Sequence, residues 1–345
     1  MSSKKVTIKH IAQAAGVSFS TVGKALHNDP LVNKETMKKI IRIAGELNYY
    51  PNLLAKGLRN KKTETIGVIF NDLKNPVYSE IIKAIEEILN NLNFTMLLCD
   101  SNFQEKLEKK NIVTMLSKDV AGIIISPVNE KSENIQLIAE NSLKAVFLDC
   151  TPDYPGISYV YVNHERAAFL ATEYLIKNGH KNILLLNGPC GLSSAQHFLK
   201  GYLKAFSFYG LIPADNLIKS INISIAGGRS IFKTLYKCKK DSGRTDFTAI
   251  VTLSDLIAMG TYKAARELSL KIPEDFSIIG YDNIFCSEIL DPPLTSVNYP
   301  KTITGKTGIN MLLDQINNRE NKSKTIIIEP GLVKRDSVKK IIDRF

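Results

Sequence analysis

The sequence predicts a small all-helical domain followed by a larger α/β domain. The first observation is charge. Residues 1–62 contain twelve Lys or Arg and three Asp or Glu, an excess of nine, whereas the remaining residues contain 33 and 31, an excess of two. The second is apolar spacing, which has the helical period over the first 50 residues. The third is the alternation of short apolar runs with amphipathic segments from Glu64 onward, which is typical of sheets covered by helices.

The whole chain has the length and composition of a multidomain globular protein. Its 345 residues are 44% hydrophobic and 23% charged, which favours two or three folded domains and excludes disorder. No stretch approaches the ~18 uninterrupted apolar residues of a membrane span. Residues 1–7 are basic and lead directly into polar sequence. We therefore expect a cytoplasmic protein without a secretory signal or a membrane partner.

The cysteines predict neither a disulfide framework nor a metal centre. Five cysteines lie singly along the chain, without any C-x-x-C pair. Isolated thiols in odd number are typical of reduced and mostly buried cysteines. We therefore expect no metal site and no cofactor.

The basic segment is predicted to form a helix-turn-helix. Thr7 can cap a first helix, and Gly16 is placed to end it. Ser18 can cap a second helix through about Leu26, and Asn33 can cap a third. Two short helices around a Gly-containing turn, supported by a third, form this motif. The residues expected to be buried are Ile8, Ile11, Ala12, Ala15, Val22, Ala25, Leu26, Met37, Ile40, Ile41, Ala44 and Leu47.

The second helix is the candidate for entry into a DNA groove. A recognition helix presents its early outward residues to base edges, which here are Phe19, Ser20 and Lys24. Three further groups are expected to contact phosphates: Thr21, Asn28 and the backbone of Ser18. The concentration of positive charge in this segment supports a nucleic-acid partner.

Residues 51–62 are predicted to be a hinge. The pattern from Asn52 to Arg59 is helical but too short to be stable alone in water, so we expect it to fold on DNA. Leu58 is the candidate apolar wedge between base pairs in the minor groove. The alternative is a plain linker whose leucines pack on the following domain.

The residues of the head resemble a known family. The run from Val6 to Ser18, the pair Thr21-Val22 and the run from Leu47 to Asn52 closely resemble the DNA-binding domain of the lactose/galactose repressor (LacI/GalR) family. Gly23 departs from the family, which usually has a phosphate-contacting Ser there. The resemblance implies base contacts at the positions named above and intercalation by Leu58. The full predicted set of DNA-binding residues is Thr7, Ser18, Phe19, Ser20, Thr21, Lys24, Asn28, Asn52, Ala55 and Leu58.

The long C-terminal part predicts parallel strands whose carboxyl ends hold a ligand. Continuous apolar runs between amphipathic helices are typical of parallel strands covered on both faces. Ligands of such sheets bind beyond the carboxyl ends of the strands. The expected strands are Ile66–Phe70, Thr95–Cys99, Gly122–Ser126, Ala145–Leu148, Ile183–Leu186, Ala249–Leu253 and Phe276–Gly280.

This part also resembles the LacI/GalR family, through motifs such as Pro76-Val77-Tyr78, the run from Ser254 to Gly260 and the run from Ile272 to Asn283. The resemblance implies a two-lobed periplasmic-binding-protein-like α/β sensor domain. The expected domains are 1–50 for the helix-turn-helix headpiece, 51–62 for the hinge and 63–345 for the sensor. Its first lobe would comprise 63–161 and 293–323, and its second 162–292 and 324–345, with three crossovers.

The resemblance also implies an effector site between the lobes. Tyr78 would pack against the effector, while Asp149, Asp282 and Ser254 would hydrogen-bond to it. Structural roles remain open for each, since Asp282 could cap a loop and Tyr78 could fill a lobe edge. Phe198 stands where the family commonly has an Arg that clamps hydroxyls or a carboxylate, and Asn163 stands where Asp is frequent. We therefore expect an effector other than a simple free hexose, or a vestigial site.

The function implied is sequence-specific, effector-controlled transcription regulation, most simply repression, by a homodimer on a palindromic operator. The effector is expected to be a sugar or sugar derivative. No leucine heptads follow Val333, so we expect a dimer rather than a tetramer. An enzyme is disfavoured because the P-loop-like Gly305-Lys306-Thr307 and the zincin-like His164-Glu165 both lack required partners. A transport-type solute-binding protein would need export, and a purely architectural DNA binder would be independent of ligand.

Overall fold

The computed structural model describes residues 6–26, 29–49, 63–152, 154–242, 247–319 and 323–341, without the side chains of 238–242. It contains two compact units, residues 1–62 and 63–345. We refer to them as the head domain and the sensor domain. Among the described residues, no helix combines the length and the apolar character that a membrane crossing requires.

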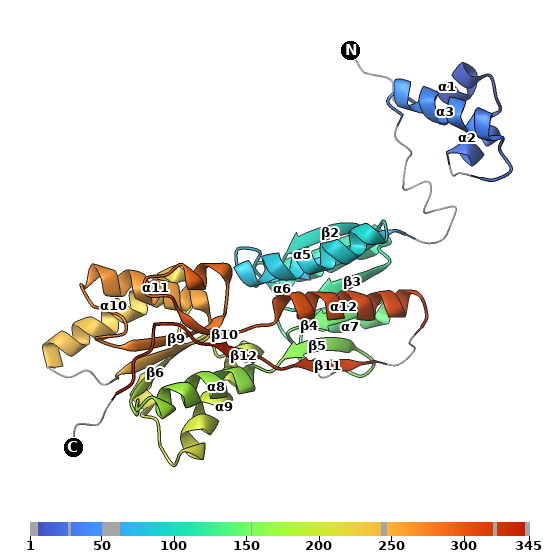
Figure 1. Ribbon diagram of the computed structural model, residues 1–345. Coiled ribbons are helices and arrows are strands. Elements are labelled where there is room, and N and C mark those ends of the chain that lie inside the picture. The colour runs from blue at the N-terminus through green and yellow to red at the C-terminus, as the bar shows by residue number, and fades with distance from the viewer. Residues whose placement is uncertain are drawn as a thin grey trace. The chain divides into compact units, whose positions relative to one another are not determined.

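The head domain is a bundle of α1 (Ile8–Ala15), α2 (Phe19–Ala25) and α3 (Lys34–Glu46) (Figure 1). The Thr7 backbone N–H donates to Nδ1 of His10 over 3.1 Å at the start of α1, and Gly16 ends the helix with a φ of 70°. The hydroxyl of Ser18 accepts the N–H of Thr21 over 3.0 Å, which caps α2. Asn33 caps α3 in the same way. These caps are the ones that the sequence predicted, because capping depends on local residue types.

The third helix corrects one part of the predicted core. Ile41 was expected to be buried but is 50% exposed, whereas Ile43 is 8% exposed and packs with Ile40 and Ala44. Four of the five residues from Ile40 to Ala44 are apolar, and only Arg42 is polar, which leaves the helical phase ambiguous. The contacts of α1 and α2 decide which of them face inward.

The sensor domain contains two six-stranded sheets, one in each lobe. The strand order is β11-β5-β4-β3-β1-β2 in the first lobe and β12-β10-β9-β8-β6-β7 in the second. All pairings are parallel except that of β12 with β10. The strands are β1 (Thr65–Phe70), β2 (Thr95–Asp100), β3 (Gly122–Ile125), β4 (Ala145–Leu148), β5 (Ser158–Val162), β6 (Ile183–Asn187), β7 (Ile218–Ser220), β8 (Ala249–Thr252), β9 (Ser277–Asp282), β10 (Thr295–Asn298), β11 (Thr325–Ile328) and β12 (Gly331–Val333).

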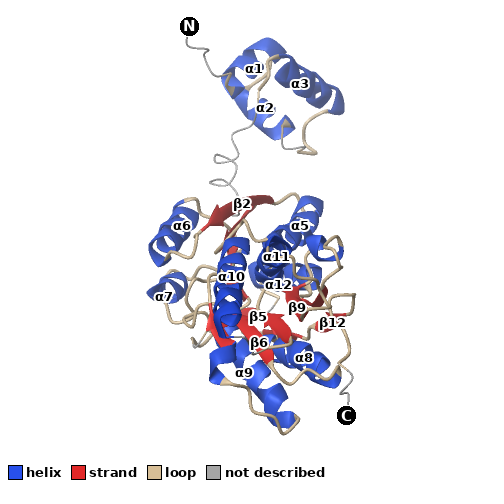
Figure 2. Ribbon diagram, turned by 90° about the vertical axis from the view of Figure 1, so that its left-hand side faces the viewer, coloured by secondary structure: helices blue, strands red, loops and turns tan. Residues whose placement is uncertain are grey.

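Helices cover both faces of each sheet (Figures 1 and 2). In the first lobe, successive strand residues point to opposite faces of the sheet, so Ile123 and Ile124 belong to two different apolar clusters. The helices α5 and α12 pack in the first cluster, and α6 and α7 in the second. In the second lobe α8 packs on α9, and α10 on α11. The helices are α5 (Pro76–Asn91), α6 (Glu105–Ser117), α7 (Glu133–Glu140), α8 (His164–Lys177), α9 (Ser193–Phe208), α10 (Ile225–Ser242), α11 (Asp255–Glu267) and α12 (Lys301–Ile316), with short 3-10 turns η1 (Asp215–Leu217) and η2 (Phe285–Glu288).

The lobe boundaries differ from the predicted ones. The chain crosses between the lobes after Val162, after Asn298 and after Ile328. The segment 293–298 was assigned to the first lobe, but β10 pairs with β9 in the second sheet. The segment 324–328 was assigned to the second lobe, but β11 pairs with β5 in the first sheet. A strand of four residues does not reveal its partner through its own sequence, so only the tertiary pairing fixes these boundaries.

Five strands, β5, β7, β10, β11 and β12, were not predicted. Most of them are short, lie near sheet edges or mix polar with apolar residues, although β5 and β11 each contain a short apolar run that sequence reasoning overlooked. The expectation of mostly buried cysteines is wrong for the four that the structure describes. All four are free thiols, but Cys150 is buried, Cys99 and Cys286 are partly buried and Cys190 is exposed.

Candidate DNA-reading helix and effector cavity

The outward face of α2 presents the predicted base-reading residues. Phe19 is 63% exposed, and Ser20 and Lys24 are also exposed. Val22 and Ala25, on the opposite face, are fully buried against the other two helices. The arrangement leaves one face of α2 free for a partner.

The other predicted DNA contacts are divided between described and undescribed residues. Thr7 and Ser18 are exposed, and the hydroxyl of Thr21 lies 2.8 Å from that of Ser18. A Cβ added at Gly23 would meet nothing within 4 Å, so the departure from Ser there is not imposed by packing in this domain. Asn28, Asn52, Ala55 and Leu58, with the whole predicted hinge of 51–62, lie outside the described residues.

A cavity of about 290 Å³ lies between the two lobes of the sensor domain. Residues that follow the carboxyl ends of the parallel strands line it from both sides, as expected for such sheets. Four of the five predicted effector residues line this cavity: Tyr78, Asp149, Ser254 and Asp282. The fifth, Phe198, does not line it. Its ring is fully buried and packs at 5.5 Å behind that of Tyr281, which does.

The first lobe supplies an aromatic wall. Tyr78, at the start of α5, stacks on Phe70 with ring centroids 4.5 Å apart. Its hydroxyl donates to Oδ1 of Asn71 over 2.6 Å. Burial, followed by the nearby charge of Asp149, raises the pKa of the Tyr78 hydroxyl, which therefore stays protonated as a donor. The ring is thus held in one orientation at the cavity edge.

A polar chain links the lobes across the cavity. Asp149 follows β4 with a left-handed φ of 59°, and its Oδ1 lies 2.9 Å from Nε2 of His164, the first residue of α8 in the second lobe. The other ring nitrogen of His164 lies 2.9 Å from the hydroxyl of Tyr281. His164 is only 2% exposed. Although their separation is that of an ion pair, neither Oδ1 of Asp149 nor Nε2 of His164 has a hydrogen-bond partner of acceptable geometry among the described residues. Both atoms are buried, so this contact between the lobes is shielded from solvent.

The second lobe presents Asp282 from a buried polar network. Asp282 ends β9 with a φ of 118°, and the hydroxyl of Ser254 donates to its Oδ2 over 2.8 Å. Burial, and next the carboxylate of Asp255, raises the pKa of Asp282 well above its ordinary value. Burial likewise raises the pKa of Asp255 to about 6. A protonated Asp282 both donates and accepts, which suits a ligand hydroxyl.

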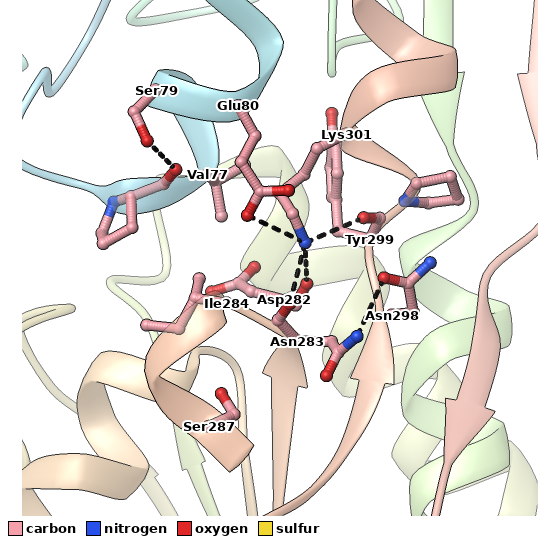
Figure 3. Close-up of polar contacts among 12 residues, drawn as sticks. Val77, Ser79, Glu80, Asp282, Asn283, Ile284, Ser287, Asn298, Tyr299 and Lys301 are labelled. Carbon is pink, nitrogen blue, oxygen red and sulfur yellow. Dashed lines mark hydrogen bonds and ion pairs between the residues drawn. The ribbon is translucent and has the colours of Figure 1, made fainter. Parts of the chain in front are cut away.

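Lys301 supports the same strand end from the first lobe (Figure 3). Its ammonium donates to the carbonyl oxygens of Asp282 and Asn283, each over 2.9 Å, and lies 3.7 Å from a carboxylate oxygen of Glu80 on α5. Both 282 and 283 have positive φ values, a conformation in which their two carbonyls meet a single donor. The side chain of Lys301 is 4% exposed. It therefore fixes the position of Asp282 relative to α5 and α12.

Sequence reasoning missed His164, Tyr299 and Lys301. It placed Tyr281 in a segment that follows a strand end but gave it no role of its own. His164 was considered only as part of an incomplete metal motif, since its cavity partners are distant in sequence. Tyr299 lies in the crossover after β10 and lines the cavity. Nothing in the sequence around Lys301 signals a buried ammonium, because its acceptors are backbone carbonyls that any residue could supply.

Comparison with known proteins agrees with this division into two functional parts. Residues 7–52 match a family model described as bacterial regulatory proteins of the lacI family, and residues 63–336 match one described as periplasmic binding proteins and sugar binding domain of LacI family. The chain is 32% identical to the HTH-type transcriptional repressor PurR of Pasteurella multocida over 337 residues, which cover 96% of this chain and 98% of the relative. It is 31% identical to the ribose operon repressor of Haemophilus influenzae over 333 residues, with coverage of 96% and 98%.

Solved structures show the same likeness. The lac repressor dimer bound to operator and the anti-inducer ONPF matches with a TM-score of 0.85 and 26% identity, over 97% of this chain and 100% of that chain. A LacI family transcriptional regulator from Enterococcus faecium with bound ribose matches with a TM-score of 0.71 and 26% identity, over 81% and 100%.

A helix-turn-helix head joined to a two-lobed sensor defines a DNA-binding transcription regulator rather than an enzyme. More specifically, the chain belongs to the LacI family of bacterial transcriptional repressors. The family resemblance that the sequence motifs indicated is thereby confirmed.

Proposed function

We propose that this chain is a cytoplasmic homodimeric repressor whose affinity for a palindromic operator is set by a small, sugar-like effector in the cavity between its lobes. The main support is the cavity itself. Its walls come from two lobes joined by three crossovers, so a ligand that contacts both walls changes their separation. Its volume, about 290 Å³, suits a small molecule.

On the DNA side, we propose that α2 enters the major groove with Phe19, Ser20 and Lys24 toward the bases. Thr7, Ser18, Thr21 and Asn28 would contact the backbone, and Asn52, Ala55 and Leu58 would act at the minor groove. The exposed face of α2 supports the first part of this proposal. Two heads in a homodimer would then read two half-sites, as the operator-bound lac repressor dimer suggests.

On the ligand side, we propose that Tyr78 packs against the effector while Asp149, Ser254 and Asp282 hydrogen-bond to it. Phe198 would act indirectly, through the ring of Tyr281. The ribose bound to the Enterococcus faecium relative supports a sugar-like effector. A coupling of ~1–3 kcal/mol would change operator affinity roughly 5–150-fold.

The test begins with selection of bound sequences from random duplex DNA by the full-length protein. We expect an enriched palindrome whose binding weakens with salt.

Lys24→Ala should lower affinity for that sequence by about 1–3 kcal/mol relative to scrambled duplex. Leu58→Gly should reduce operator bending, whereas Lys38→Ala on the exposed face of α3 should change specificity little. A protein that bound the selected and scrambled duplexes equally would contradict the proposal.

A further inference from the structure

The charge of the cavity wall indicates which ligands it accepts. Among the described residues, the lining includes the carboxylates of Asp72, Glu130 and Asp149, the carboxyl group of Asp282, which is neutral when protonated, and one ammonium, that of Lys131. Arginine is absent from the described residues that line it. Lys131 is exposed at the rim, whereas Asp149 lies between the lobes. The cavity therefore concentrates negative potential in its interior.

The neighbouring lysine and histidines do not reverse this balance. The ammonium of Lys301 lies behind Asp282, where backbone carbonyls and Glu80 surround it, and it does not line the cavity. Burial lowers the pKa of His197, which packs behind the wall against Tyr161, so its ring is neutral near pH 7. The ring of His164 lies against Asp149, with Nε2 2.9 Å from Oδ1.

The tyrosines around the cavity are affected by the same negative charge. After burial, the charge of Asp149 is the largest cause of the raised pKa of Tyr78, Tyr281 and Tyr299. These hydroxyls come from both lobes and from the crossover between them. An anion placed among them would be disfavoured for the same electrostatic reason as a tyrosinate.

The hydrogen-bonding groups of the cavity wall also favour a ligand that donates a hydrogen bond. The buried Nε2 of His164 and Oδ1 of Asp149 have no hydrogen-bond partner of acceptable geometry among the described residues. A ligand amine or hydroxyl that comes between these two atoms would donate to Oδ1. A phosphate or carboxylate would need cationic donors, which this interior does not provide.

We infer that the cavity selects by charge: it accepts an uncharged or amine-bearing polyhydroxylated ligand and rejects phosphorylated or carboxylated ones. This inference rests on the proposed function, because it names the class of effector for the same site. It narrows the expected sugar derivatives to those that are uncharged or carry an amine.

Charged thiol reagents test this selection without knowledge of the natural effector. Ser194 lines the cavity near the start of α9, and Ser207 is exposed near the end of the same helix. In a Cys190→Ser background, the full chain with Ser194→Cys or Ser207→Cys is treated with 2-(trimethylammonium)ethyl or 2-sulfonatoethyl methanethiosulfonate. The introduced thiolate attacks the reagent's sulfur, forms a mixed disulfide and releases methanesulfinate. Peptide mass spectrometry gives the rate at each site.

We expect the cation-to-anion rate ratio to be about tenfold larger at Ser194→Cys than at Ser207→Cys. Adding Asp149→Asn should lower the ratio several-fold at the cavity site and leave the exposed site unchanged. Equal ratios at the two sites, or a ratio that Asp149→Asn does not move, would overturn the inference. Binding of the selected operator by the same variants is measured in parallel, so that failure of the regulator function is recognised separately.

Discussion

The two walls of the cavity hold their carboxyl groups in different ways. In the first lobe, Asp149 directly follows β4, and its Oδ1 lies 2.9 Å from Nε2 of His164 in the opposite lobe. In the second lobe, Asp282 is held by Ser254 and lies beside Asp255, which anchors a buried network. The donors to Asp255 are the hydroxyls of Ser287 and Ser296 and the N–H of Ile284. The second wall is organised within its own lobe, whereas the first is completed only across the cleft.

This difference indicates which wall changes when a ligand alters the separation of the lobes. A carboxyl group held by hydrogen bonds inside one rigid lobe keeps its position when the lobes move. A carboxylate whose partner belongs to the other lobe changes its environment with every change in lobe separation. We therefore regard the second wall as the fixed part of the site and the Asp149–His164 contact as the part that senses closure.

Among these predictions, removal of Asp255 should have the largest effect on stability, and it tests how differently the two walls are organised. Asp255→Ala leaves two serine hydroxyls and one backbone N–H without their buried acceptor, and should lower the free energy of unfolding by about 3–5 kcal/mol. Asp72→Ala in the first wall, where the carboxylate accepts the N–H of Lys74 in a partly exposed turn, should cost less than about 1 kcal/mol. Urea unfolding measures both. Similar losses would show that the two walls are equally organised.

The pH dependence of stability tests the same network. Because burial raises the pKa of Asp255 from 3.8 to about 6, the folded protein keeps a proton that the unfolded chain has lost between these values. This group's contribution to stability is therefore present below about pH 4 and declines as the pH rises to about 6. The decline is about 3 kcal/mol for a shift of this size. Asp255→Asn should remove it, so unfolding curves for the two proteins that stay parallel from pH 4 to pH 7 would refute the assignment.

The lysine that joins the two walls has a matched control on its own helix. Lys301 and Lys306 both pair α12 with a glutamate of α5, but the Lys306–Glu87 pair is half-exposed. Lys301→Met should cost about 2 kcal/mol, because buried carbonyls of 282 and 283 lose their donor. Lys306→Met should cost less than about 0.5 kcal/mol. Hydrogen exchange should also speed up around residues 281–284 in the first variant alone; unchanged exchange there would exclude a positioning role.

The smallest expected effect lies in the head domain. Gly23 is inside α2, and an added Cβ meets no atom within 4 Å. Gly23→Ala should therefore stabilise the helix by about 0.5–1 kcal/mol. Slower amide exchange over residues 19–25 would reveal it, with the sensor domain as an internal reference. Faster exchange would mean that contacts of Gly23, rather than helix propensity, determine which residue is most stable at this position.

Local chemistry made much of this molecule predictable. The caps at Thr7, Ser18 and Asn33 follow from residue types a few positions apart, and the apolar runs located seven of the strands. The rule that ligands bind beyond the carboxyl ends of parallel strands predicted the edge of the sheets at which the cavity lies. The family resemblance predicted Tyr78, Asp149, Ser254 and Asp282, all of which line it.

By itself, the sequence determined the helical head, the α/β sensor and the family, since charge, periodicity and motifs are properties of contiguous residues. Only the tertiary structure decided that β10 belongs to the second lobe and β11 to the first, and that Ile43 rather than Ile41 is buried. It also decided that His164 and Lys301 join the walls of the cavity. The physical reason is that strand pairing and buried polar contacts form between residues far apart in the chain. Their free energy depends on distances that no local pattern encodes.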